Sequence, residues 1–252
     1  MPAFEILYEE GPVLAVCKSA GILTQAARGI ESLERELKAF LLRRDQAAGD
    51  IYLVPVHRID RPVSGALLFA RHVRAAKRLG HQFEKRQVRK IYWACVEGHV
   101  DPPAGTWVDW MRKVPGEPRA EPVDEHHPDA LQAVLHYRVL ATGDERSWLE
   151  IELETGRTHQ IRLQASGRGH HVLGDTQYGS TAAFGPQHDD VRLRPIALHA
   201  RSITFRHPNS GRFVQLTAPC PDYWRELPLG DENNTRAGGV ETWPQQNIGS
   251  RV

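Results

Sequence analysis

The stretch VHRIDRPVSGALLFA, residues 56–70, decides the fold. A polar loop leads there into a continuous apolar run, which is typical of a strand buried on both faces. The loop holds one acidic residue, Asp60, between Arg58 and Arg61. A carboxylate that acts as nucleophile or base must be ionised and accessible, and neighbouring arginines favour its charged form. Two interpretations remain open at this point: a poised catalytic group, or a structural ion pair in a loop.

Further elements are indicated on both sides of this loop. Apolar spacings of three and four predict helices, and alternating or continuous apolar runs between turn signals predict strands. Helices and strands are mixed without strict alternation, and most neighbouring strands are joined as hairpins. We therefore expect an α+β fold with a mixed, largely antiparallel central sheet flanked by helices. The expected helices are 30–44, 73–86 and 159–167, the last capped by Thr158, and the expected strands include 4–8, 13–18, 51–56, 66–70, 90–98, 106–111, 134–140, 147–155, 196–205 and 212–218.

Chain length and composition indicate a single core. The 252 residues are 40% hydrophobic, which suffices for one well-buried domain. From Pro228 onward the sequence is polar and has no apolar periodicity. We expect one domain over residues 1–227 and a flexible C-terminal tail over residues 228–252.

Several classes of protein are disfavoured by what the sequence lacks. No apolar run approaches the roughly 20 residues of a membrane helix, and the first residues do not form a secretory signal. The three cysteines are scattered, as in reduced cytosolic proteins, and no zinc-type spacing or phosphate-cradling glycine loop occurs. We expect a cytoplasmic monomer with no membrane association, no metal and no nucleotide cofactor.

Charge is segregated along the chain although the net charge is only +1. Residues 57–90 hold ten Lys or Arg against two acidic residues, and residues 156–225 hold nine Arg against four Asp. Between them, residues 101–155 hold twelve acidic residues against five basic ones. If the two basic segments meet in the fold, they form a face that attracts a polyanion such as RNA. The alternative is that they are solvated helix faces.

Two more segments carry residues suited to chemistry. LETGRTHQIR, residues 153–162, packs polar and basic side chains into a strand-to-helix junction, which can hold a phosphate or an anionic intermediate, or can be merely a capped helix. Tyr92 lies centrally on an alternating strand, where its ring can stack on a base or belong to the core. The candidates in the junction are Arg157, Thr158, His159, Gln160 and Arg162.

Taken together, these segments resemble the RluA-like family of RNA pseudouridine synthases. VHRIDRPVSGALLFAR resembles the signature loop of that family, and KIYWACVEG (90–98) is similar to its second motif with a central tyrosine. LETGRTHQIRLQASGRGHHVLGDTQYG (153–179) is similar to the third motif, and LHARSITFRHP (198–208) to the usual C-terminal stretch. The resemblance covers about residues 5–220, with motif order and spacing in agreement.

The resemblance implies the pseudouridine synthase catalytic-domain fold and a cofactor-free isomerase that converts uridine to pseudouridine in structured RNA, ribosomal RNA being favoured over transfer RNA. Asp60 falls on the essential aspartate, Tyr92 on the tyrosine that contacts the target base, and Arg162 on the basic residue that pairs with the aspartate. Arg58 falls on the arginine that helps to displace the flipped base. The remaining expected RNA contacts are His57, Arg61, Arg157, Thr158, His159 and Gln160.

Two rival functions remain. A non-catalytic RNA-binding or ribosome-assembly factor can retain such a fold, but it has no need of Asp60, Tyr92 and Arg162 together. A nucleoside glycosidase uses a carboxylate too, but common glycosidases need a second one at a fixed distance. No second acid stands beside Asp60 or within LETGRTHQIR, residues 153–162, apart from Glu154 on the preceding strand.

Overall fold

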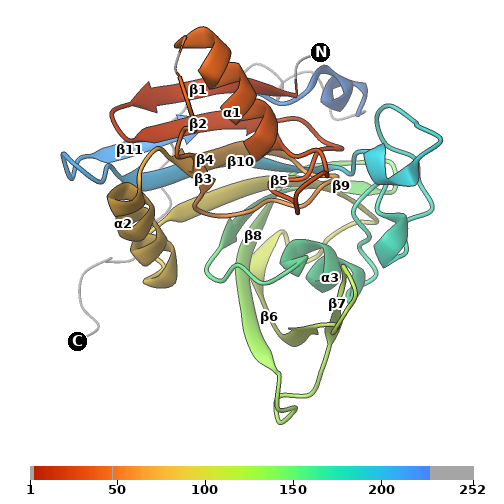
Figure 1. Cartoon of the computed structure of the whole chain (residues 1–252). Coiled ribbons are helices and arrows are strands. Elements are labelled where there is room, and N and C mark those ends of the chain that lie inside the picture. Colours follow the sequence, from red (N-terminus) through yellow and green to blue (C-terminus); the bar gives the residue numbers. More distant parts are fainter. Residues whose placement is uncertain (1–2, 47, 228–252) are drawn as a thin grey trace.

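A computed structural model describes residues 3–46 and 48–227, so the expected tail over residues 228–252 lies outside the described residues. One extended sheet forms the body of the molecule, with helices packed on its faces (Figure 1). The α-helices are α1 (Leu33–Arg44), α2 (Val73–Glu84) and α3 (Gln160–Ser166), and the 3-10 turns are η1 (Thr176–Tyr178), η2 (Val191–Leu193) and η3 (Asp222–Glu226). The strands are β1 (Phe4–Glu10), β2 (Val13–Lys18), β3 (Val54–Pro55), β4 (Ser64–Ala70), β5 (Arg89–Glu97), β6 (Ala104–Lys113), β7 (Ala120–Pro122), β8 (Leu131–Gly143), β9 (Arg146–Leu153), β10 (Leu198–Arg206) and β11 (Phe213–Thr217).

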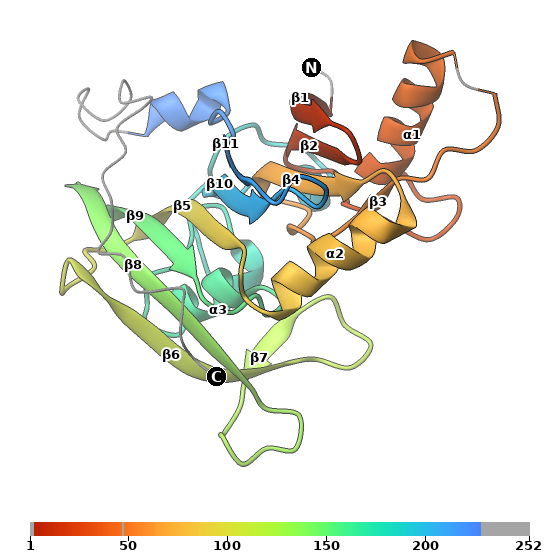
Figure 2. The ribbon, with the colours of Figure 1, turned by 90° about the vertical axis from the view of Figure 1, so that its left-hand side faces the viewer.

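The strand order is β1-β2-β4-β10-β5-β9-β8-β6-β7, with β11 paired to β10 and β3 paired to β4. Among these described strands, only β10 and β4 run parallel, and the other pairs are antiparallel. The predicted mixed, largely antiparallel sheet is therefore confirmed. Figure 2 shows how β6, β7 and β8 curve away from the half of the sheet that carries α1 and α2.

The parallel pair depends on Gly65. This residue has φ +121°, and a Cβ atom there would lie 2.3 Å from the carbonyl oxygen of Ala200 on β10. Only glycine therefore allows β10 to approach the end of the loop that carries Asp60. The close approach fixes the position where the signature loop enters the sheet.

Strand β4 is buried along its whole length, as its continuous apolar run predicted. Leu67 and Phe69 belong to the cluster that also contains the buried leucines of α1. Leu68 belongs to a second cluster, which contains Leu79 of α2. Because successive side chains point to opposite faces of a strand, this single apolar run binds one helix on each face of the sheet.

Two predicted helix starts are wrong. The first helix begins at Leu33 rather than at residue 30, and Ile30 is 53% exposed. The third begins at Gln160, and its N-cap is His159 in a left-handed conformation (φ 53°), not Thr158. The start of an element depends on how the preceding loop packs, which apolar spacing does not encode. The predicted hairpins 134–155 and 196–218 and the strand within 99–130 are confirmed, the last as the longer β6.

Candidate active site

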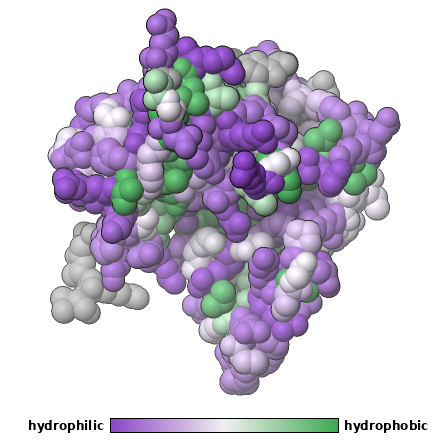
Figure 3. All heavy atoms as spheres, in the orientation of Figure 1, coloured by the Kyte–Doolittle hydropathy of each residue, from purple (hydrophilic) through white to green (hydrophobic). Residues whose placement is uncertain are grey.

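A cavity of about 1100 Å³ opens where the signature loop, β5 and the start of α3 meet. All ten residues singled out from the sequence line it, although they come from segments up to about 100 positions apart. In the space-filling view the surface is hollowed between the two halves of the molecule, and its rim is mostly hydrophilic (Figure 3). The lining residues among the ten are His57, Arg58, Asp60, Arg61, Tyr92, Arg157, Thr158, His159, Gln160 and Arg162.

Asp60 lies in the loop between β3 and β4, and its side chain is 28% exposed toward the cavity. Arg162 of α3 is 3% exposed and donates from Nη1 to Asp60 Oδ2 over 3.3 Å. The carboxylate thus has one oxygen against a buried guanidinium while the group remains accessible from the cavity. This arrangement suits a carboxylate that must be both charged and reactive.

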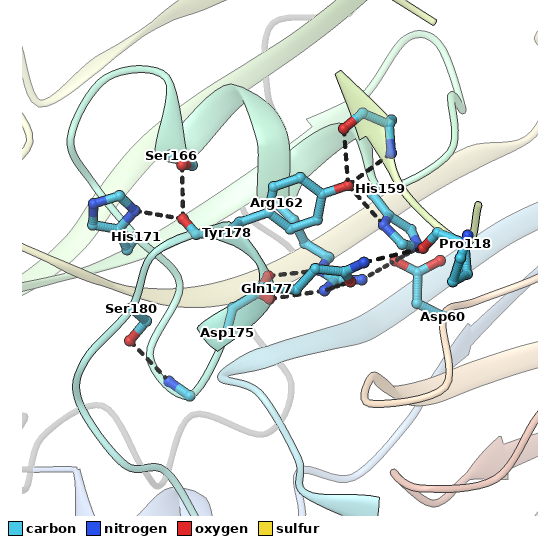
Figure 4. A network of polar contacts seen from close by, with 12 residues as sticks. Asp60, Pro118, His159, Arg162, Ser166, His171, Asp175, Gln177, Tyr178 and Ser180 are labelled. Atoms are coloured by element: carbon cyan, nitrogen blue, oxygen red, sulfur yellow. Dashed lines mark hydrogen bonds and ion pairs between the residues drawn. The ribbon is translucent and has the colours of Figure 1, made fainter. Parts of the chain in front are cut away.

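Arg162 has a second, closer carboxylate partner that sequence reasoning missed. Its Nε and Nη2 donate to the two oxygens of Asp175, over 2.6 and 2.8 Å, and Asp175 is 1% exposed. Nη2 also donates to Gln177 Oε1 over 2.8 Å (Figure 4). Burial works against the charge of Arg162, but the bonds to Asp175 and the charge of Asp60 raise its pKa overall. Asp175 therefore holds the guanidinium charged and in place. The sequence signal that could have identified Asp175 is the one that identified Asp60, namely an acidic residue in a segment rich in arginine.

His159 and Tyr178 close one side of the network in Figure 4. His159 Nδ1 is 2.8 Å from the Tyr178 hydroxyl, and its Nε2 is 3.8 Å from Asp60 Oδ2. Burial lowers the pKa of His159, while the Asp60 charge opposes this shift. The Tyr178 ring lies beneath the Arg162 guanidinium at 4.8 Å. The hydroxyl of Tyr178 also accepts a bond from the backbone N–H of Ala120, which ties β7 to the site.

Tyr92 of β5 pairs with Ile151 of the neighbouring strand β9, and it lines the same cavity. Within the described part of the chain, no group forms a hydrogen bond with its hydroxyl. Burial, and then the charge of Asp60, raise the pKa of Tyr92, so its phenol stays protonated at neutral pH. A ring and an O–H donor are therefore available to a ligand beside Asp60.

Two residues expected to contact RNA are engaged in holding the fold. Gln160 is 3% exposed, and its amide oxygen accepts from Thr155 Oγ1 and from the backbone N–H of Arg157, while its Nε2 donates to the carbonyl of Val134. Nε2 of His57 accepts the backbone N–H of Leu68. These side chains shape the cavity wall, and for Gln160 an RNA contact is not available in this structure.

The other expected contacts lie at the rim of the cavity. Arg58 is exposed and, among the described residues, has no hydrogen-bond or ion-pair partner. Arg61 donates from Nε to the carbonyl of Gly21, and Arg157 donates from Nε to the carbonyl of Gln132. Thr158 also lines the cavity. Arg58 is thus the cation of this group that is most free to reach a ligand.

Two lysines were also missed by the sequence analysis. Lys18 is fully buried under the signature loop, and its Nζ donates to the carbonyls of Ser19, Ile22 and Arg61. Burial lowers its pKa to about 7, and Asp60 opposes the shift. Lys90 lines the cavity, and burial together with the charge of Arg86 lowers its pKa to about 8. Neither position has a local pattern that marks it, because burial of a lysine depends on the packing of distant segments.

Within residues 3–46 and 48–227, no group of three or more His, Cys, Asp or Glu side chains is arranged to hold a metal ion. No helix in the same part of the chain has the length and apolar character needed to cross a membrane. The chemistry available at the cavity is that of the Asp60 carboxylate, the Tyr92 phenol, two imidazoles (His57 and His159) and several cations. The exposed carboxylates of Glu84 and Glu154 also belong to its lining.

Comparison with known families assigns the class. The family described as RNA pseudouridylate synthase matches residues 12–167, and the chain belongs to this family. Its relatives fall within the RluA-like branch. A dual-specificity RNA pseudouridine synthase RluA from Vibrio vulnificus is 31% identical over 88% of this chain and 85% of its own length. A tRNA pseudouridine synthase C from Pasteurella multocida is 31% identical over 88% of this chain and 94% of its own length.

Other relatives are longer than this chain. An uncharacterised RNA pseudouridine synthase from Chloroflexus aurantiacus is 37% identical over 81% of this chain, and the match spans 62% of that relative. Among solved structures, the human RNA pseudouridylate synthase domain containing 4 superposes with a TM-score of 0.70 over 87% of this chain and 90% of its own, at 21% sequence identity. This last similarity supports the fold alone, and it confirms the pseudouridine synthase fold predicted from the motifs.

Proposed function

We propose that this chain isomerises uridine to pseudouridine in structured RNA, with Asp60 as the catalytic carboxylate. The observation that carries the proposal is the arrangement Asp60–Arg162–Asp175. One carboxylate is 28% exposed to the cavity, and the other is 1% exposed and holds the shared guanidinium. The buried partner satisfies most of the guanidinium, so the accessible carboxylate is held only by the 3.3 Å contact from Arg162 and by His159 Nε2 at 3.8 Å among the described residues.

The chemistry requires that uracil leaves the ribose, turns, and is rejoined through carbon 5. The uridine must first be flipped out of its RNA context, which costs a few kcal/mol. Asp60 then either attacks the sugar or base, or removes a sugar proton; both routes place the reacting atom at the exposed carboxylate oxygen. Tyr92 stacks on the extruded ring, and its protonated hydroxyl is available as a donor beside the carboxylate. Arg58 at the rim fills the space that the flipped base leaves.

The cations at the rim support an RNA substrate, since they can contact phosphates on either side of the target. We propose ribosomal RNA first and transfer RNA second as the substrate. The printed names of relatives support both, because one acts on tRNA by name and another is a ribosomal large subunit pseudouridine synthase D from Xanthomonas campestris, 31% identical over 92% of this chain and 71% of its own length. We also propose that the enzyme works in the cytoplasm as a monomer; a single chain supplies the carboxylate, the phenol and the cations of the cavity.

The test is release of tritium from carbon 5 of uracil in labelled total RNA taken from cells that lack this protein. Wild type is compared with Asp60→Asn, which keeps the shape of the side chain and removes its charge. Wild type is expected to release tritium, and Asp60→Asn is expected to bind RNA nearly as well but to release none. Full activity of Asp60→Asn would refute the role of this carboxylate. Separate ribosomal and transfer RNA pools then assign the substrate.

The same assay separates the rival functions. A binding or assembly factor would bind RNA tightly with no release by wild type. A glycosidase would generate free uracil, which chromatography of the reaction mixture detects. The proposed isomerase leaves the base attached to the RNA, so the product is found only after the RNA is digested to nucleosides.

A further inference from the structure

Helix α2 carries a row of basic side chains on its solvent side. Arg74, Lys77 and Arg78 lie on α2 and Lys85 is its C-cap; relative to Arg74 the other three stand three, four and eleven positions further on, and all four are exposed. Residues at these spacings share one face of a helix. The row extends over eleven residues, about 16 Å at the rise of an α-helix. The opposite face holds Ala75, Leu79 and Gln82, which are buried against the sheet.

The row is not neutralised by the protein. Among the described residues, no carboxylate pairs with Arg74, Lys77 or Lys85, and none of these side chains forms a hydrogen bond. Arg78 donates only to the carbonyl of Pro208, which leaves its charge uncompensated. The four cations are therefore available to an anion from outside.

Helix α1 of the same chain shows the usual arrangement. Its first turn contains Glu34 and Glu36, and its last turn contains Arg43 and Arg44, which matches the helix dipole. Lys38 pairs with Glu34 over 2.6 Å, and Arg35 lies 3.5 Å from Glu31. In α2 the first turn has no acidic residue and instead contains Arg74, and like charges recur at i, i+3 and i, i+4. Such an arrangement disfavours the isolated helix, so stability does not explain it.

The row leads to the candidate active site. Phe83, Glu84 and Arg86, at the C-terminal end of α2, line the cavity, and Lys90 follows them on β5. Lys85 therefore lies at the cavity rim, and Arg74 lies one helix length away from it. Figure 1 shows this end of α2 directed toward the space between the two halves of the molecule, and Figure 3 shows a mostly hydrophilic surface over the same helix.

We propose that α2 is a second RNA contact site, on which the phosphates of the strand that leaves the active site bind to Arg74, Lys77, Arg78 and Lys85. The inference rests on the proposed function for the position of the target uridine. Its ligand is the phosphodiester backbone, because all four side chains of the row are cations that can contact phosphates. The exposed His81 lies on the same helix face, at three residues from Arg78, and is the ring there that a base could contact. The site therefore adds affinity that is independent of sequence and sensitive to salt.

The test compares two triple variants that lose the same charge from different helices. R74Q/K77Q/K85Q removes three cations of the α2 row, and R35Q/K38Q/R43Q removes three from α1. Binding is measured by fluorescence anisotropy with a labelled 30-nucleotide RNA that contains no uridine, so that turnover cannot interfere. The dissociation constant is followed from 50 to 200 mM salt. Each phosphate contact contributes about 0.7 to 0.9 to the slope of log affinity against log salt.

The slope measured for the α2 variant is expected to be smaller than the wild-type slope by about 2 to 3. Between 50 and 200 mM salt, the affinity of wild type should therefore fall by a factor about 20 to 40 times larger than the factor for the variant. The α1 variant is expected to keep the wild-type slope. An unchanged slope in the α2 variant, or an equal change in both variants, overturns the proposal. R74K/K77R/K85R, which retains the charges, should behave as wild type, and if it does not, the α2 change is not electrostatic.

This measurement is separate from the test of the proposed function. Tritium release by wild type reports the isomerase, whereas the salt slope reports the α2 site even if no isomerisation occurs. With labelled total RNA, the α2 variant should show a raised KM and an unchanged kcat, since none of the three residues lines the cavity.

Discussion

Asp175→Asn tests how the buried ion pair supports the site. The substitution keeps the size of the side chain but removes the charge that faces Arg162, and the amide can accept only one of the two bonds at 2.6 and 2.8 Å. Both groups are at most 3% exposed, so water cannot replace the lost bond. Breaking a buried pair by removing one partner costs about 3 to 5 kcal/mol, and the retained bond places Asn at the lower end, about 3 kcal/mol.

Urea unfolding measures this loss of unfolding free energy. In a thermal melt, about 3 kcal/mol corresponds to a loss of roughly 6 to 12 °C in Tm for a domain of this size. Turnover should fall as well, by about 10- to 100-fold, because Arg162 is then free to move toward Asp60 and to hold its reactive oxygen. Tritium release at saturating RNA measures that part.

The matched control is Asp190→Asn. Asp190 also accepts a two-pronged bond from an arginine, Arg192, but that arginine is 71% exposed. Its removal should leave the unfolding transition unchanged within error, because surface pairs contribute little. Equal unfolding free energies of Asp175→Asn and wild type, or equal losses in the two variants, would refute the argument that the buried carboxylate maintains the guanidinium.

Three other perturbations follow from the site and the fold. Tyr92→Phe keeps the ring and removes the hydroxyl, so KM should be retained while kcat for tritium release falls at least about 100-fold if that hydroxyl transfers a proton; retained kcat would assign Tyr92 to stacking alone. Burial, and then Lys90, lower the pKa of His57 to about 3, against about 6.5 in the unfolded chain. Above pH 6.5 both states are neutral, and as the pH falls from 6.5 toward 3 only the unfolded state gains the proton, so stability is lost over this window. His57→Gln should show a shallower acid loss in urea unfolding, and an identical pH profile would contradict the assignment. Gly65→Ala combines a positive φ with a 2.3 Å approach to a backbone oxygen, so it should cost more than about 3 kcal/mol. Gly211→Ala, which has φ +72° and open space, should cost only about 1 kcal/mol, and similar losses for the two would show that the close approach is unimportant.

Much of the fold followed from local patterns. The strands predicted at residues 147–155 and 66–70 are observed as β9 and β4, since side-chain direction along a strand repeats every two residues. The helix predicted at residues 73–86 from apolar spacings of three and four is observed as α2, which ends two residues earlier, at Glu84. The order of the strands was not predicted from the sequence. The pairing of β10 with both β4 and β5 depends on a close approach at Gly65, which no local spacing reports.

The sequence by itself indicated ten of the residues that line the cavity, but not Asp175 or Lys90. The carboxylate of Asp60 among arginines and the polar junction of residues 153–162 can both be recognised from the local sequence. The order of the motifs linked them to one family. Only the tertiary structure decided how these residues share their bonds. Arg162 lies 102 positions from Asp60 and 13 from Asp175, and its shorter hydrogen bonds are to Asp175. The side-chain amide of Gln160 forms its hydrogen bonds within the fold. The physical reason is that a buried polar group must be satisfied by whatever packing brings near it, and that packing joins segments far apart in the chain.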